Sequence, residues 1–241
     1  MGYTEAEFIV LGISLLVILA ISFVLRLVLK NKSNMAKQAP FFVITVILLV
    51  LEIIKQVLAM QGGYSIGALP MHFCSTYFVW FSLANFTKGK FRAAMKTVAF
   101  VSTIYLVALF YFAPVIVIGD ACKNIFATFG SFHTFVFHHL VILYFFLCLF
   151  LKNYHFEKRH LLHWVVSISA YYLLAVFVAN KTGVNFMSIL YCEIQYIDNI
   201  RLTVGQLAYN IGLGIVTVGI GACIIALASH YTQKKEKKYN H

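Results

Sequence analysis

The chain has 241 residues, of which 61% are hydrophobic and 11% are charged, and its formal net charge is +11. Ordinary soluble domains have about 45–50% apolar and about 25% charged residues, so this composition excludes a soluble globular domain, whose surface needs more charges than are present. The sequence therefore predicts an integral membrane protein. No Pro-rich or Gly/Ser-rich segment divides it, and we expect residues 1–241 to form a single transmembrane domain.

Several apolar runs reach the roughly 20 residues that a transmembrane helix needs. We expect seven such helices, at residues 7–29, 41–60, 69–87, 95–118, 126–151, 161–180 and 203–229. The runs are continuously apolar rather than alternating, which argues against barrel strands. The predicted fold is all-α: a polytopic membrane protein built as a bundle of seven transmembrane helices, with a basic tail at 230–241.

The basic residues indicate how this bundle is oriented. Most of the 19 Lys and Arg residues follow the first, third, fifth and seventh runs, and few lie at the other ends. By the positive-inside rule, the N-terminus is then outside and the C-terminus inside. The positive charge thus reports topology, so we expect no nucleic acid as a partner, and we expect the basic tail to meet anionic lipid headgroups.

Polar side chains gather in the outer half of the predicted membrane. They come from four segments, 41–60, 69–87, 126–151 and 203–229, and from the loop before the last of these. The residues are Glu52, Lys55, Gln56, His72, Cys74, His133, His138, His139, Asn185, Arg201, Gln206 and Asn210. Ionisable groups in a membrane are costly and usually face the bundle interior or a watery cavity. We therefore predict a polar pocket that opens outward.

Cys74 is the candidate nucleophile of this pocket, because a cysteine attacks as the thiolate when a base and positive charge are near. His138 or His139 is the candidate base; adjacent helical residues point about 100° apart, so the two histidines face different directions. His72 is a further candidate, although positions 72 and 74 lie about 200° apart on a regular helix. The predicted reaction is acyl transfer from a membrane phospholipid through a thioester, without a cofactor or a metal.

The remaining polar residues are candidate substrate-binding residues: Glu52, Lys55, Gln56, His133, Asn185, Arg201, Gln206 and Asn210. Gln206 and Asn210 are spaced i,i+4 and share a helix face. Glu52 and Lys55, spaced i,i+3, could instead form a structural ion pair. Arg201 could equally be an interfacial anchor.

Two other functions stay open. A transporter or small-ligand-binding protein would use Glu52, Lys55 and Arg201 to bind a polar solute or relay protons, although the chain lacks the paired inverted halves of many transporters. A membrane metalloenzyme would bind zinc or iron through Cys74 and several of the histidines, but the spacing HxxxxHH is not a known ligand signature.

Two further patterns have structural meaning. Small residues recur every seven positions in the 203–229 helix, in one row through Gly205, Gly212 and Gly219 and another through Gly214 and Gly221. Small residues let helices approach closely in membranes, so we expect this helix to be packed centrally. Cys122 and Cys192 both fall in predicted outer loops and could form a disulfide.

Four stretches of the sequence also resemble a known family. They are LEIIKQ (51–56), LPMHFC (69–74), FHH (137–139) before LVILYFF, and TGVNF (182–186). Together they resemble the YwaF-like family of seven-helix membrane proteins, bacterial relatives of transmembrane protein 164, which is regarded as a cysteine-dependent lipid acyltransferase. The resemblance implies that Cys74 is the nucleophile and that His138 or His139 matches the family histidine. It also implies that the protein lies in a bacterial plasma membrane. Phe186 stands where many members have tyrosine.

Overall fold

The computed structural model describes residues 3–239, with the side chains of 235–239 excluded. Residues 240–241 of the predicted basic tail lie outside the described residues, and the backbone of the rest of the tail continues the last helix. Contacts divide the chain into two compact units. The first contains Met1–Gly63 and Tyr77–His155, and the second contains Tyr64–Thr76 and Phe156–His241.

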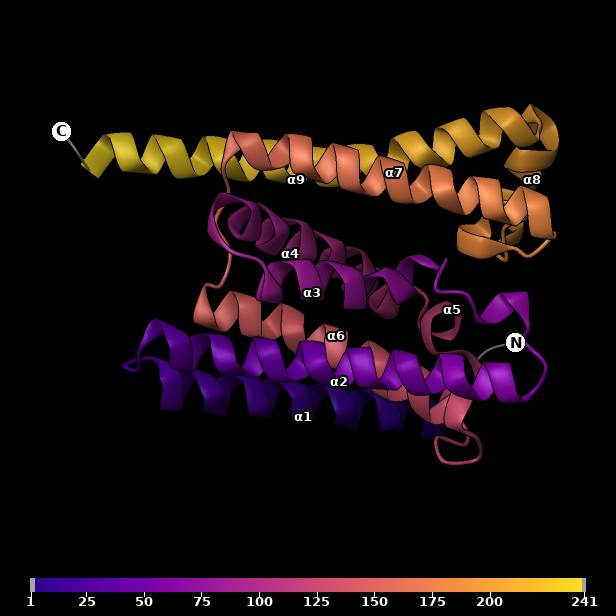
Figure 1. Cartoon of the computed structure of the whole chain (residues 1–241), viewed down its shortest axis with the longest axis horizontal. Coiled ribbons are helices and arrows are strands. Elements are labelled where there is room, and N and C mark those ends of the chain that lie inside the picture. Colours follow the sequence, from indigo (N-terminus) through magenta and orange to yellow (C-terminus); the bar gives the residue numbers. More distant parts are fainter. Residues whose placement is uncertain (1–2, 240–241) are drawn as a thin grey trace. The chain divides into compact units, whose positions relative to one another are not determined.

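Helices make up all the regular secondary structure of the described residues (Figure 1). The first unit contains α1 (Glu5–Leu29), α2 (Asn34–Gln61), α3 (Tyr77–Phe86), α4 (Gly89–Phe112), α5 (Pro114–Ile118), the 3₁₀ turn η3 (Gly119–Cys122) and α6 (Phe129–Leu151). The second unit contains the 3₁₀ turns η1 (Ile66–Ala68) and η2 (Phe73–Thr76), then α7 (Lys158–Thr182), η4 (Phe186–Ser188), α8 (Gln195–Val204) and α9 (Gln206–Tyr239).

Six of the described helices are long and apolar enough to cross a membrane: α1, α2, α4, α6, α7 and α9. They correspond to six of the seven runs expected from the sequence, with ends shifted by up to ten residues. The chain is therefore an all-α, multi-pass integral membrane protein.

The expected third helix, at 69–87, is wrong as a continuous span. Only Tyr77–Phe86 is α-helical, and with η2 the helical stretch is 14 residues, or about 20 Å at 1.5 Å per residue, short of the roughly 30 Å hydrocarbon core. The physical reason lies at Pro70: proline has no N–H to donate and forces the residue before it out of the helical region, and Leu69 has ψ 140°.

Two other boundaries have similar causes. The 95–118 run breaks at Ala113 (φ −148°, ψ 61°), directly before Pro114, which starts α5. The 203–229 run breaks at Gly205, whose φ of 85° lies in the left-handed region that favours glycine. Residues 195–204 therefore form the separate helix α8, and α9 begins at Gln206.

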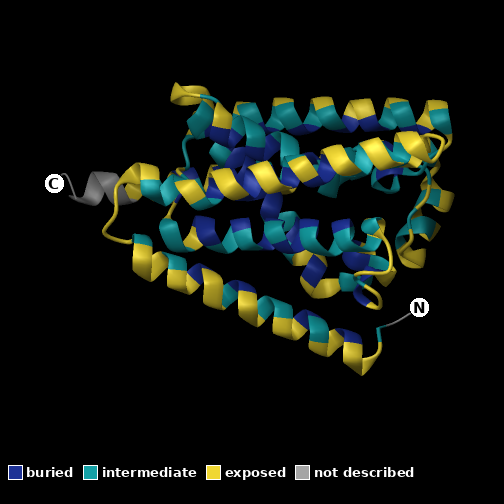
Figure 2. Ribbon diagram, turned by 60° about the horizontal axis from the view of Figure 1, so that its bottom comes forward, coloured by how far each residue is buried: buried dark blue, intermediate teal, exposed yellow. Residues whose placement is uncertain are grey.

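In the first unit, α6 packs against α1, α2 and α4, and α3 packs between α2 and α4. Burial is uneven: 61% of the most apolar 18-residue stretch of α4 is buried, against 17% of the corresponding stretch of α1. Figure 2 shows the resulting stripes, with dark buried residues along one side of a helix and exposed residues along the other. The exposed stripes are apolar, as expected of helix faces that meet lipid.

The predicted basic loops meet at one end of the first unit. Lys96 donates from Nζ to Gln38 Oε1 (2.8 Å) and to Asn153 Oδ1 (2.7 Å), so the starts of α2 and α4 lie beside the end of α6. At the other end, the Tyr3 hydroxyl donates to the carbonyl of Gly119 (2.9 Å). The alternation of loops predicted from the charges is thus present in this unit, and which end faces the cytoplasm stays a prediction.

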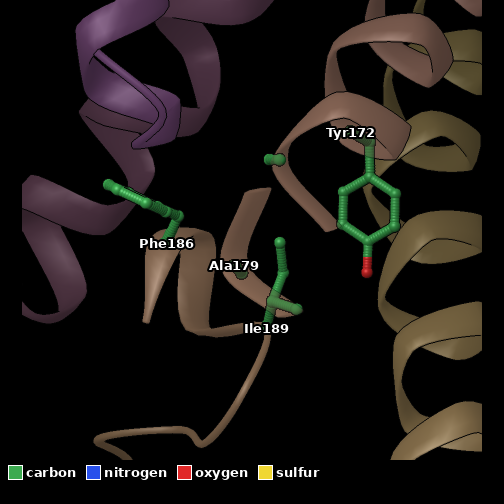
Figure 3. Close-up of a cluster of buried hydrophobic side chains, with 5 residues drawn as sticks. Tyr172, Ala179, Phe186 and Ile189 are labelled. Carbon is green, nitrogen blue, oxygen red and sulfur yellow. The ribbon is translucent and has the colours of Figure 1, made fainter. Parts of the chain in front are cut away.

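The second unit is organised around α7 and α9. Tyr172, Ala175, Ala179, Phe186 and Ile189 form a buried cluster at the end of α7, with Phe186 and Ile189 supplied by the turn that follows it (Figure 3). The Tyr172 hydroxyl donates to the carbonyl of Asn210 on α9 at 2.8 Å. This cluster fixes the 185–191 turn against α7.

Only one of the two small-residue rows of α9 packs closely. A Cβ at Gly214 would lie 2.8 Å from the Tyr172 ring, and one at Gly221 would lie 2.1 Å from the Trp164 ring. A Cβ at Gly212 or Gly219 would meet nothing within 4 Å. With 17% of its apolar window buried, α9 is not the centrally packed helix expected from the glycine pattern.

Candidate functional site

A buried polar cluster joins α2 and α6 in the first unit. Glu52 Oε1 lies 2.8 Å from Lys55 Nζ and accepts a hydrogen bond from Gln56 Nε2 at 2.7 Å. On α6, His133 Nε2 lies 3.6 Å from the other carboxylate oxygen, Glu52 Oε2. Glu52 is 4% exposed and His133 is 8% exposed. The structure thus brings together four of the expected substrate-binding residues, three of them through local helix spacing and His133 through tertiary packing.

Two atoms of this cluster lack hydrogen-bond partners among the described residues: Glu52 Oε2 and His133 Nε2. A buried polar atom left unsatisfied costs about 1–3 kcal/mol, so such atoms are uncommon without a functional reason. The two atoms face each other at 3.6 Å, just beyond hydrogen-bond distance, and both are almost fully shielded from solvent, so a ligand reaches them only if neighbouring side chains move.

His138 and His139, side by side in the sequence, have different environments. Each Nδ1 donates to a carbonyl one turn earlier at 2.6 Å, His138 to Thr134 and His139 to Phe135. In the neutral imidazole this leaves the lone pair on Nε2. His139 Nε2 lies 2.7 Å from the Ser14 hydroxyl on α1, whereas the buried His138 Nε2 has no hydrogen-bond partner.

Ser14 is the residue of this site that sequence reasoning missed. Its Oγ also lies 2.8 Å from the carbonyl of Leu11, so the hydroxyl proton has two acceptors within reach. The only sequence signal was a polar residue inside the apolar 7–29 run. Its partner is 125 residues away in the chain, a pairing that no local pattern indicates.

Cys74 and His72 lie in the second unit, in the irregular segment after Pro70. Cys74 is half-buried in η2, and His72 precedes that turn. The Tyr171 hydroxyl of α7 lies 2.8 Å from the carbonyl of Pro70 and 3.1 Å from that of His72. The His72 ring packs edge-on against Phe186 with ring centroids 5.2 Å apart. The regular helix assumed for these positions is therefore absent, and α7 holds the segment through its backbone carbonyls.

Asn185 closes the turn that follows α7. Its Nδ2 donates to the carbonyl of Tyr191 (2.9 Å), and its Oδ1 accepts from the backbone N–H of Leu190 (2.9 Å). The neighbouring residues Met187 and Ser188 have φ of 54° and 58°, in the left-handed region. The amide of Asn185 thus holds the conformation of this turn, and a substrate-binding role for it stays a prediction.

Arg201, Gln206 and Asn210 form a second polar chain across the α8–α9 junction. Arg201 binds Asp198 through two contacts, Nε to Oδ1 at 2.6 Å and Nη2 to Oδ2 at 3.0 Å. Its Nη1 donates to Gln206 Oε1 (3.2 Å), and Gln206 Nε2 donates to Asn210 Oδ1 (3.1 Å). Hydrogen bonds from Arg201 and from the Cys192 N–H lower the pKa of Asp198 from 3.8 to about 2.

The candidate residues therefore fall into two groups. Glu52, Lys55, Gln56, His133, His138 and His139 belong to the first unit, and His72, Cys74, Asn185, Arg201, Gln206 and Asn210 belong to the second. Within the described part of the chain, no group of three or more His, Cys, Asp and Glu side chains is arranged to hold a metal ion. Cys122 and Cys192 are both free cysteines, and Cys122 Sγ donates to the carbonyl of Glu7 at 3.7 Å, so the disulfide suggested by the sequence is not formed in this structure.

The model of the TMEM164 family matches residues 2–219, nearly the whole chain. No curated protein and no solved structure matches the chain. The family match supports the resemblance seen in the sequence at the level of the whole family, and membership of the YwaF-like bacterial branch stays a prediction.

Proposed function

The chain belongs to the TMEM164 family, and on that premise we propose that it is a membrane-embedded lipid acyltransferase or transacylase. Cys74 is the proposed nucleophile and a histidine of α6 the proposed base. The observation that carries the choice of histidine is the buried Nε2 of His138, which holds the lone pair and has no hydrogen-bond partner, whereas Nε2 of His139 contacts Ser14. His138 is therefore the proposed base.

The proposed reaction has two balanced steps. In the first, the Cys74 thiol gives its proton to His138 Nε2, and the thiolate attacks the ester carbonyl of a phospholipid. The C–O bond then breaks, the leaving alkoxide takes the proton from His138, and the acyl group remains on sulfur as a thioester. In the second, an acceptor hydroxyl gives its proton to His138 and attacks the thioester. The C–S bond breaks and releases the Cys74 thiolate, and His138 then returns the proton to this thiolate.

The Glu52 cluster is proposed to bind the polar part of the substrate. Its two unsatisfied atoms, Glu52 Oε2 and His133 Nε2, could bind one hydroxyl: the carboxylate would accept the hydroxyl hydrogen, and a protonated Nε2 would donate to the hydroxyl oxygen. Lys55 and Gln56 hold the other carboxylate oxygen and so orient Glu52. In the second unit, Arg201 is proposed to meet lipid phosphate, which a guanidinium binds well.

The first test is acyl transfer to Cys74. The purified protein is mixed with a phospholipid that carries a labelled acyl chain, and the adduct is mapped by mass spectrometry. We expect a thioester on Cys74, none in Cys74→Ser, and a rate about 10²–10⁴ lower in His138→Ala, the usual contribution of a general base. Absence of the adduct with every phospholipid class tested, while a thiol reagent still labels Cys74, would refute the thioester mechanism.

A transporter is the second candidate, and one observation favours it: the buried Glu52–Lys55 pair with His133 at 3.6 Å resembles a proton-binding site within a membrane. Flux of protons or solute in vesicles that is lost in Glu52→Gln but unchanged in Cys74→Ser would favour this function over acyl transfer.

The proposed location is a bacterial plasma membrane, with the N-terminus outside and the C-terminus inside. This orientation requires that the segment ending in α3 crosses the membrane as a seventh passage beside the six long helices. The charge distribution of the loops supports this orientation. Protease protection of a C-terminal tag in inside-out and right-side-out vesicles tests it: the tag should be cut in the inside-out vesicles alone, and the opposite pattern would reverse the orientation.

A further inference from the structure

A long groove runs between α7 and α9 in the second unit. Its volume is about 820 Å³, and its walls are apolar apart from Ser169 along most of its length. On α9 it extends from Gln206 to Gly219, which is about 20 Å at 1.5 Å per residue. That length is about two thirds of a hydrocarbon core about 30 Å thick, enough to hold an extended acyl chain from one leaflet.

The two ends of the groove differ in chemistry. One end is lined by three amides, Asn180 on α7 and Gln206 and Asn210 on α9. Beside this end, Arg201 donates to Gln206, and Lys181 follows Asn180 with its side chain exposed. Away from the amide end, beyond Tyr172, the walls of the groove are mostly aliphatic. The groove is thus polar at its mouth, where Asp198 neutralises Arg201 and Lys181 adds a positive charge, and apolar along its length, which complements an anionic lipid.

Glycine gives the groove its depth at the apolar end. Gly219 lines it, and a Cβ there would meet no atom within 4 Å, so the space beside it is open. The helices on either side are both candidate membrane spans. A groove of this kind within a bilayer is filled by the surrounding lipid, and its polar mouth selects how that lipid is oriented.

We propose that the α7–α9 groove binds one acyl chain of a phospholipid, with the ester and phosphate at Asn180, Gln206 and Asn210 and the chain running toward Gly219. Nδ2 of Asn180 gives one of its two hydrogens to the carbonyl of Val176 and has the other for an ester or phosphate oxygen, and the exposed cation of Lys181 attracts the phosphate. This binding does not require acyl transfer, so it stands or falls separately from the proposed catalytic function.

The test is photolabelling of the full-length protein in phosphatidylethanolamine and phosphatidylglycerol vesicles. A trace of phosphatidylglycerol carries a diazirine near the end of one acyl chain, and adducts are mapped by mass spectrometry. Ile215 in the groove and Leu16 on α1 are matched probes, because they are 67% and 68% exposed. We expect about tenfold more adduct on Ile215, equivalent to a preference of about 1.4 kcal/mol over bulk lipid.

Two glycine substitutions provide the matched pair of variants. Gly219→Phe should fill the groove and remove the excess labelling of Ile215. Gly212→Phe introduces the same ring on the same helix, also where a Cβ meets nothing within 4 Å, but Gly212 does not line the groove. We expect Gly212→Phe to label as the unmodified protein does.

Two results would overturn the proposal: equal labelling of Ile215 and Leu16, or unchanged labelling of Ile215 in Gly219→Phe. Cys74→Ser separates this inference from the proposed function. Strong labelling of Ile215 without any acyl group on Cys74 would support lipid binding in the groove and contradict the acyltransferase. An acyl group on Cys74 without excess labelling of Ile215 would contradict lipid binding in the groove alone.

Discussion

The contact between Gly221 and Trp164 makes a sharp prediction about stability. A Cβ at position 221 would lie 2.1 Å from ring carbon Cζ2, and the ring cannot easily turn away because its Nε1 donates to the carbonyl of Val218 at 2.8 Å. Overpacking of this kind costs about 1–3 kcal/mol, and so severe an overlap belongs at the upper end. Ala gains about 1 kcal/mol over Gly in helix propensity, so Gly221→Ala should lose about 2 kcal/mol net.

Gly219→Ala is the matched control, because the same change two residues earlier meets nothing within 4 Å. It should gain up to about 1 kcal/mol from helix propensity, which leaves a difference of about 3 kcal/mol between the variants. At about 2–4 °C per kcal/mol for a chain of this size, their melting temperatures should differ by about 6–12 °C. Thermal unfolding in one detergent, followed by tryptophan fluorescence, measures this. Equal melting temperatures, or a more stable Gly221→Ala, would refute the close packing of α9 on α7.

Three other predictions follow from single contacts. Glu52→Gln should destabilise the protein by about 1–3 kcal/mol in denaturant unfolding, because the half-buried Lys55 loses the carboxylate that binds it. Glu52→Gln combined with Lys55→Met should recover part of this loss, and a loss that is no smaller in the double variant would contradict the ion pair. His139→Ala should cost about 1 kcal/mol beyond its packing loss, measured as coupling in a double-mutant cycle with Ser14→Ala, and zero coupling would remove that hydrogen bond. The pKa of Asp198 is lowered from 3.8 to about 2, so its stabilising effect is complete above pH 3.8 and is lost as the pH falls toward 2. Melting temperatures across this range should show that dependence, and Asp198→Asn should flatten it; an equal slope in the variant would count against the Arg201 pairing.

The helices could largely be predicted from the sequence, because length and hydropathy decide which segments cross a membrane. The breaks could not be placed as well. Pro70 stood at the head of the 69–87 run, yet the run is continuously apolar, and hydropathy does not distinguish a helix from an irregular segment that packs against protein. Gly205 was interpreted as part of a packing row, but its positive φ ends α8.

The candidate site shows the same division between local and distant contacts. The contacts of Glu52 with Lys55 and Gln56, and of Gln206 with Asn210, follow from helix periodicity and were predictable. The contact of His133 with Glu52 needed the packing of α6 on α2, which no local pattern encodes.

The two adjacent histidines of α6 have different surroundings, which suits the different roles proposed for them. Each gives its Nδ1 proton to a carbonyl four residues earlier, so both present the same unprotonated nitrogen. Because neighbouring residues point about 100° apart, the two nitrogens face different surroundings. Nε2 of His139 contacts the Ser14 hydroxyl of α1 and thereby links α1 to α6, while Nε2 of His138 has no hydrogen-bond partner, as its proposed role as the base requires. Removing His138 should therefore affect chemistry more than stability, and removing His139 should do the opposite.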